Sequence, residues 1–171
     1  METALPLVKE FKNVFITRSF SKAHGLAGMR IGYALGHADT LARISASWGM
    51  GDVNMLGALA ALTALNDNEH IEWERQENFA IKTFVIKAFE EMGYEVPYTH
   101  TNHLFVNLGM PASKFRDACL AHNILVGRDF PPLEKTHCRI SLGSREEMEH
   151  DVARLHEYGL WATLQRGDQA L

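Results

Sequence analysis

Residues 19–33 read SFSKAHGLAGMRIGY and join two short apolar segments. The β-branched and apolar residues 13–17 predict one strand before this stretch, and residues 30–35 predict a second strand at its end. We expect both to be buried parallel strands. Residues 18–29 are rich in serine and glycine and too polar for a core element, so they predict a loop with at most a turn or two of helix.

The residue types around Lys22 suit a bound phosphate. Ser19 and Ser21 supply hydroxyl donors, and the nearby glycines permit a close approach of the backbone. Arg30, at the edge of the next strand, can grip a phosphate with two parallel hydrogen bonds. A lysine beside such a pocket is placed to bond covalently to a carbonyl compound. The alternative is that Lys22 is an ordinary solvated side chain, as surface lysines in loops usually are.

The stretch as a whole resembles the cofactor-lysine signature of the class I/II aminotransferases, which are pyridoxal 5'-phosphate (PLP) enzymes of fold type I. The similarity is greatest to the histidinol-phosphate aminotransferase branch. The resemblance implies that Lys22 is the catalytic residue that bonds to PLP. It also implies that Ser19 and Arg30 bind the PLP phosphate, often joined by Ser21.

A second block supports the resemblance. Residues 123–130 read NILVGRDF and residues 138–148 read CRISLGSREEM, which resembles the family's C-terminal block. The resemblance implies that Arg139 binds the substrate α-carboxylate, for which a guanidinium is a planar two-pronged donor. Alternatively, Arg139 is a strand-edge arginine paired with a local acid. Arg128 either helps to bind a substrate phosphate or is a solvated loop side chain beside Asp129. Residues 130–135 depart from that branch, so the substrate stays open.

The rest of the hydrophobic pattern predicts alternating helices and strands. Helices are expected at 38–47 and 54–65, with Asn54 as the cap of the second, which is apolar on most faces and so expected to be buried. A long helix over 69–92 ends at Gly93. Ser144 and Glu147 form a capping box that starts the closing helix. The remaining predictions are a helix at 112–122 and strands at 95–100, 103–108, 124–126 and 138–142.

These elements predict an α/β protein, and the resemblance implies the C-terminal portion of PLP fold type I. We expect part of the large PLP-binding domain at 1–68, a connecting long helix at 69–93 and the small C-terminal domain at 94–171. The resemblance runs from about Leu5 to Tyr158 and corresponds to the second half of a family member. No Asp-x-Ala-Tyr motif precedes Lys22. A fragment, a subunit completed by another chain and a non-catalytic remnant are all compatible with this.

The implied reaction is amino-group transfer between an amino acid and a 2-oxo acid. Lyase and decarboxylase reactions stay open, because related enzymes reuse the lysine motif. The family resemblance also implies a homodimer. The net charge of −4 favours no nucleic-acid partner, and no apolar run approaches the roughly 18–20 residues of a membrane span. No histidine has a recognised metal-ligand spacing, so no metal is expected. We expect no secretory signal in residues 1–11 and expect the two cysteines to be free thiols, which favours the cytoplasm.

Overall fold

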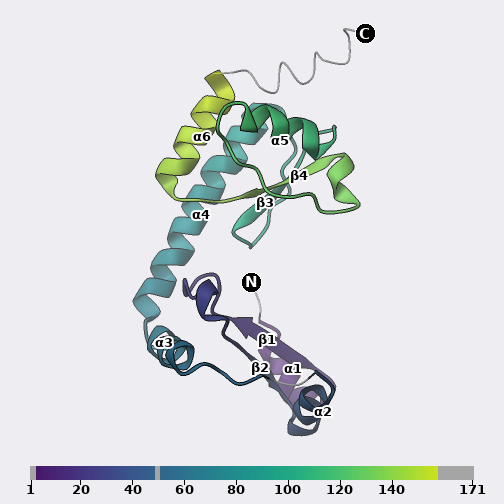
Figure 1. The fold of residues 1–171 in the computed structure, drawn as a ribbon, viewed down its shortest axis with the longest axis vertical. Coiled ribbons are helices and arrows are strands. Elements are labelled where there is room, and N and C mark those ends of the chain that lie inside the picture. Colours follow the sequence, from purple (N-terminus) through teal and green to yellow (C-terminus); the bar gives the residue numbers. More distant parts are fainter. Residues whose placement is uncertain (1–2, 49–50, 158–171) are drawn as a thin grey trace. The chain divides into compact units, whose positions relative to one another are not determined.

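The computed structural model describes residues 3–48 and 51–157 of the chain. It divides into two compact units, Met1–Arg75 and Gln76–Leu171, with the division inside the long helix α4 (Asn68–Glu91). Each unit is described by itself. Residues 158–171 lie outside the described residues. Figure 1 shows the elements of both units in chain order.

Unit 1, residues 1–75, is built around a two-stranded sheet. Its strands β1 (Phe15–Ser19) and β2 (Gly32–Gly36) pair antiparallel, with Ser19 opposite Gly32. A Cβ atom on Gly32 would lie 2.7 Å from the carbonyl oxygen of Arg18, so the pairing needs a glycine there. The other elements are α1 (Leu5–Glu10), the 3₁₀ turn η1 (Ala27–Met29), α2 (Ala38–Trp48) and α3 (Met55–Leu65).

The prediction of buried parallel strands is wrong for this pair. Parallel strands need a crossover connection, usually a helix, and the loop between β1 and β2 contains only the short turn η1. The strands are also open to solvent, with Phe15 at 45% and Tyr33 at 40% exposure. The expected loop with at most a turn or two of helix is confirmed. The pattern did not predict α1.

Helix α3 is capped as expected but is not buried. Asn54 Oδ1 accepts a hydrogen bond from Gly57 N at 2.6 Å, which confirms the cap. Only Gly57 and Ala61 of α3 are buried, whereas Leu56 is 73% and Leu59 is 62% exposed. The apolar composition predicted burial, but the described chain has no layer that covers this side of the helix.

Unit 2, residues 76–171, has an antiparallel sheet of β3 (His103–Asn107) and β4 (His137–Ser141). Side chains of β3 alternate, with Leu104 and Val106 fully buried. They pack against the end of α4, α5 (Ala112–Leu120) and α6 (Arg145–Glu157), which form one core with the strands. The 3₁₀ turn η2 (Leu133–Lys135) leads into β4. This unit holds the larger core of the described chain.

Most predicted elements of unit 2 are confirmed, including the stop of α4 at Gly93, whose φ is +88°. Residues 95–100 are not a strand, since only a single bridge joins Glu95 to Asn107. Pro97 within them has no N–H to donate. Residues 124–126 are not a strand either. Ile124 N donates to Cys119 O at 3.0 Å, so this backbone closes the end of α5.

Lys82 lies off the apolar stripe of α4 and is nevertheless buried. Its Nζ donates to the carbonyl oxygen of Thr99 at 2.8 Å and lies 5.8 Å from the ring centre of Tyr98. Burial lowers the pKa of this lysine. The side chain ties the segment after α4 to the helix, a long-range contact that hydrophobic periodicity does not report.

Candidate cofactor and anion sites

Lys22 lies in the loop that leaves β1, and its side chain is exposed. The loop closes through two backbone bonds, from Gly25 N to Lys22 O at 2.8 Å and from Leu26 N to Phe20 O at 2.9 Å. Gly25 has a φ of +66°, which an L side chain rarely adopts. The turn therefore fixes the backbone of Lys22 while its side chain stays exposed to solvent.

Phe20 anchors this loop to unit 1. It is buried with Ile31 and Ala61, and its ring centre lies 4.8 Å from that of His24 and 5.8 Å from that of Tyr33. The Nδ1 atom of His24 is buried and has no hydrogen-bond partner among the described residues. Phe20 is buried in the core of unit 1, whereas Ser19 and Ser21 on either side of it are not.

Ser19, Ser21 and Arg30 supply the donors of the Lys22 loop. Ser21 N donates to Ser19 Oγ at 3.1 Å, which ties the two serines together. Arg30 is left-handed, with a φ of +54°, and its Nη1 donates to Ala27 O at 2.8 Å. Two hydroxyls and a guanidinium with further N–H groups on one loop form a donor set that fits a phosphate dianion.

Asn54 supports this loop from α3, a role that the sequence did not indicate. Its Nδ2 donates to Met29 O at 2.9 Å, directly before Arg30, while its Oδ1 caps the helix. A Cβ atom on Gly57 would lie 2.7 Å from this amide, so a glycine is needed beneath it. In the sequence, Gly57 is the one residue that indicates how closely the Asn54 side chain packs against the start of α3.

The second group of predicted site residues lies in unit 2. Arg139 is on β4, where its Nη2 lies 3.3 Å from Ser141 Oγ and its Nε is buried without a hydrogen-bond partner among the described residues. Arg128 is in the loop before β4. The guanidinium carbons of Arg128 and Arg139 each lie 4.7 Å from the ring centre of Phe130, so the fold brings the two arginines to one side chain.

Asp129 does not serve as the partner of Arg128. It forms an ion pair with Arg116 of α5, and this bond raises the pKa of the Arg116 guanidinium. Within the described ranges, no carboxylate lies within ion-pairing distance of Arg139. Arg128 likewise forms no ion pair among the described residues, so neither guanidinium is paired directly with a carboxylate there.

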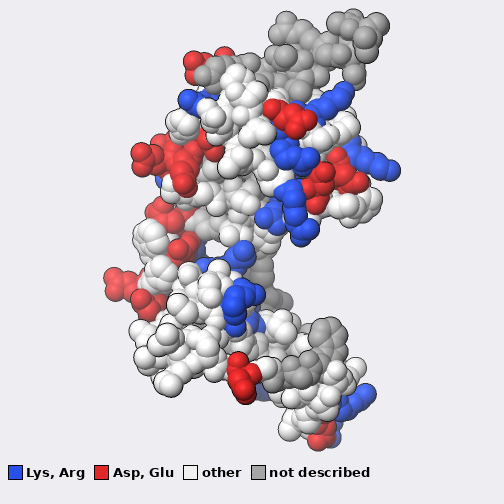
Figure 2. Space-filling model, in the orientation of Figure 1, with Lys and Arg blue, Asp and Glu red and all other residues white. Residues whose placement is uncertain are grey.

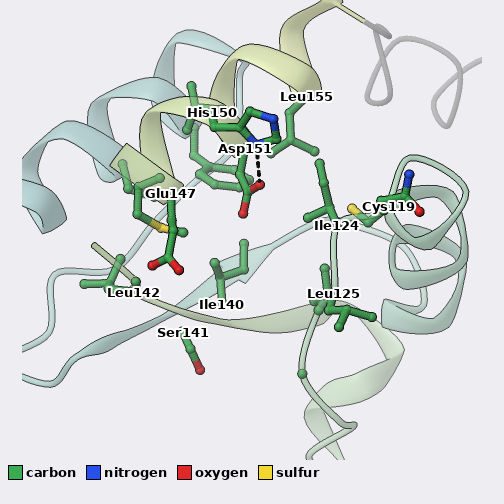
Figure 3. Close-up of a pocket in the computed structure, with 18 of the residues that line it drawn as sticks. Cys119, Ile124, Leu125, Ile140, Ser141, Leu142, Glu147, His150, Asp151 and Leu155 are labelled. Atoms are coloured by element: carbon green, nitrogen blue, oxygen red, sulfur yellow. Dashed lines mark hydrogen bonds and ion pairs between the residues drawn. The ribbon is translucent and has the colours of Figure 1, made fainter. Parts of the chain in front are cut away.

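A cavity of about 820 Å³ in unit 2 was not predicted from the sequence, and Ser141, the hydrogen-bond partner of Arg139, is among the residues that line it. Figure 3 shows it beside α6 and the segment after α5, with Glu147 and Asp151 directed toward it. Its walls are mainly apolar, including Ile124, Ile140 and Leu155. None of the predicted site residues lines this cavity.

Surface charge, possible metal ligands and possible membrane helices can each reveal a further type of site in the described residues. On the face seen in Figure 2, acidic side chains gather at the left, while most lysine and arginine side chains lie at the right beside further acidic ones. Among the described residues, no three His, Cys, Asp or Glu side chains are grouped to hold a metal. Over the same ranges, no helix has the length and apolar character that crossing a membrane requires.

Residues 1–155 match the family model "Aminotransferase class I and II". Histidinol-phosphate aminotransferase 2 of Methylococcus capsulatus is 34% identical over 156 residues, which are 89% of this chain and 41% of that protein. A structure from Erwinia carotovora atroseptica, described as a candidate histidinol-phosphate aminotransferase, gives a TM-score of 0.87 at 29% identity. That match covers 94% of this chain and 47% of the other.

A third relative carries a ligand. The histidinol-phosphate aminotransferase of Sinorhizobium meliloti, solved in complex with pyridoxal-5'-phosphate, has a TM-score of 0.76 at 26% identity. The match covers 90% of this chain and 42% of that one. The chain therefore spans less than half the length of these relatives.

Proposed function

The chain belongs to the class I and II aminotransferase family, and on that premise we propose that it carries the cofactor lysine of a PLP-dependent aminotransferase. The family is PLP-dependent, and the fold is a portion of PLP fold type I. The observation that carries the proposal is the Lys22 loop. It presents an exposed amine on the same loop as two hydroxyls and a guanidinium.

Each residue of the loop has a role in this proposal. Ser19, Ser21 and Arg30 would hold the phosphate of the cofactor, and the amine of Lys22 would bond to its aldehyde carbon with loss of water. When bound, PLP supplies an electron sink at the substrate α-carbon. Once the substrate amine replaces it on the cofactor, the freed amine of Lys22 would hold and return the proton of that carbon. The reaction is the transfer of an amino group between an amino acid and a 2-oxo acid.

The arginines of unit 2 bind the substrate. Arg139 receives the α-carboxylate, because its charge is not offset by a neighbouring acid and a guanidinium suits a carboxylate. Arg128 receives a second anionic group, such as a phosphate. The similarity to proteins called histidinol-phosphate aminotransferases supports a phosphorylated amino compound as one substrate.

Peptide mapping tests the role of Lys22. The chain is incubated with PLP, reduced with borohydride, digested and examined by mass spectrometry. We expect the label on Lys22, and we expect it to be lost in Lys22→Arg. Lys12→Arg, at an exposed lysine of the same unit, is the control and should keep the label. A label on another lysine with none on Lys22 would show that the cofactor bonds elsewhere.

We also propose that two copies of the chain pair in the working enzyme, as the family resemblance implies. The exposed leucines of α3, including Leu56, Leu59 and Leu62, support this, since monomers rarely leave such apolar faces open. Sedimentation velocity should show a dimer for the parent chain and less dimer for Leu59→Gln. Purely monomeric parent chain at micromolar concentration would contradict the pairing.

A further inference from the structure

Phe130 lies against both arginines that the proposed function assigns to substrate binding. The guanidinium carbons of Arg128 and Arg139 are each 4.7 Å from its ring centre, within the range of a cation–π contact. The two cationic groups are thus no further apart than twice this distance. One small molecule with two anionic groups can reach both.

The ring of Phe130 is itself held in place. It meets Phe105 of β3 edge to face, with ring centres 5.6 Å apart and an angle of 79° between the planes. Phe105 is also the cross-strand partner of Arg139. Beside the ring, Asp129 pairs with Arg116, and Leu133 N donates to Phe130 O at 2.8 Å. The position of the Phe130 ring is therefore fixed by its contact with Phe105 and by the backbone and ion-pair contacts of residues 129 and 130.

An aromatic partner leaves the positive charge of an arginine available to bind an added anion, whereas an acidic partner does not. The carboxylate of Asp129 offsets the charge of Arg116, so that guanidinium has little to offer an added anion. A ring attracts the cation without neutralising it. It also limits the rotamers of a long side chain, which lowers the entropy cost of ordering that side chain when a ligand binds.

We propose that Phe130 is a positioning residue that holds Arg139 and Arg128 for anion binding. The proposal rests on the proposed function of the two arginines and adds the element that orients them. It also narrows the ligand to a compound with two anionic groups, one for each guanidinium. Phe130 contacts the two arginines and Phe105 of unit 2 and is not part of the Lys22 loop of unit 1, so its removal should weaken anion binding by the arginines without changing that loop.

Arginine modification by phenylglyoxal, read by peptide mass spectrometry with and without succinate, tests the proposal. Succinate has two carboxylates and no ketone or aldehyde that could condense with Lys22. It should slow modification of Arg128 and Arg139 in the parent and in Phe130→Tyr, which keeps the ring. In Phe130→Leu, equal protection should need about threefold more succinate. Arg43, exposed on α2, should react alike throughout.

The outcomes separate the two proposals. Absence of protection in the parent contradicts anion binding by the arginines. Equal protection in the parent and Phe130→Leu overturns the role of Phe130 alone. Arg116 is protected by its ion pair with Asp129, so it should react more slowly than the exposed Arg43. If the two react equally fast in Phe130→Leu, the loop around residue 129 has unfolded in that variant. The comparison is then made with Phe130→Met in place of Phe130→Leu. Nuclear Overhauser contacts from the Phe130 ring to both arginines are expected in the parent whatever the variants do, and their absence also overturns the proposal.

Discussion

Arg30 ends the loop that carries the proposed cofactor lysine, and its side chain folds back over the loop through the bond to Ala27 O. We expect Arg30→Ala to weaken PLP binding by about 1.5–3 kcal/mol, the value of a hydrogen bond to a charged group. Titration of the chain with PLP, followed by absorbance, measures this. Arg43→Ala removes an exposed arginine from α2 of the same unit and should leave the affinity unchanged. Equal affinity in Arg30→Ala and the parent would place the phosphate elsewhere.

For single residues, the sequence indicated which side chains have the chemistry of a phosphate site, but not which side chains contact one another in the fold. The serines, Lys22 and Arg30 could be selected because hydroxyls, an amine and a guanidinium at close spacing suit a phosphate. The shared contact of Arg128 and Arg139 with Phe130 could not be predicted, because the two arginines meet there only after the chain folds. The two cysteines are free and buried, as expected for reduced thiols, and burial raises the pKa of Cys119 to about 12.

At the element scale, local signals succeeded where the interaction itself is local. Caps span three or four residues, so Asn54 and the stop at Gly93 could be predicted from neighbouring residues. Strand direction and strand pairing depend on distant partners. The apolar residues 124–126 resemble a strand in sequence, yet their backbone closes the end of α5. Composition likewise predicted burial of α3, whereas burial depends on what packs against the helix.

The start of α6 provides a prediction about pH. Ser144 N and Ser144 Oγ both donate to Glu147 Oε2, at 2.7 and 2.9 Å, and these bonds lower the pKa of Glu147 below its ordinary value of 4.5. A carboxyl with a depressed folded-state pKa stabilises the fold above its unfolded pKa. This contribution is lost as pH falls through the lower folded-state value.

Glu147→Gln should therefore lower the melting temperature by a few degrees at neutral pH, and the difference should shrink in acid. Thermal unfolding of the parent and the variant between pH 7 and strongly acidic pH would measure it. Ser144→Ala removes the partner hydroxyl and is the matched control, expected to show the same sign of pH dependence. A melting difference that stays constant across this range would mean that the charge of Glu147 does not contribute.

For the whole molecule, the division into two units reflects where apolar side chains gather. Unit 1 has a small buried cluster of Phe20, Ile31 and Ala61, while unit 2 packs α4, α5, α6 and its sheet around one larger core. Alternating strands and helices predicted two groups of elements, and the family resemblance indicated the fold type. The apolar residues of unit 1 are largely exposed, and the segments at 13–17, 30–35 and 54–65 predicted burial from their own sequence, so the small size of this core does not follow from local pattern alone.

This difference predicts unequal protection against hydrogen exchange. Amides of α3 and α5 both have helical hydrogen bonds, so a comparison of the two helices reports packing and not the presence of a bond. Phe115 and Cys119 anchor α5 in the core, whereas most apolar side chains of α3 face solvent. Opening α5 requires the core of unit 2 to loosen, while α3 can open with little loss of buried area.

We therefore expect amides of α5 to exchange at least about tenfold more slowly than those of α3 in the purified chain. Exchange monitored by mass spectrometry of peptides from each helix would show this, with β3 behaving like α5. Pairing of two copies through α3 would protect that helix, so the measurement is made over a range of concentrations. Slow exchange of α3 at all concentrations would mean that its leucines are covered within the chain itself, and would contradict the prediction.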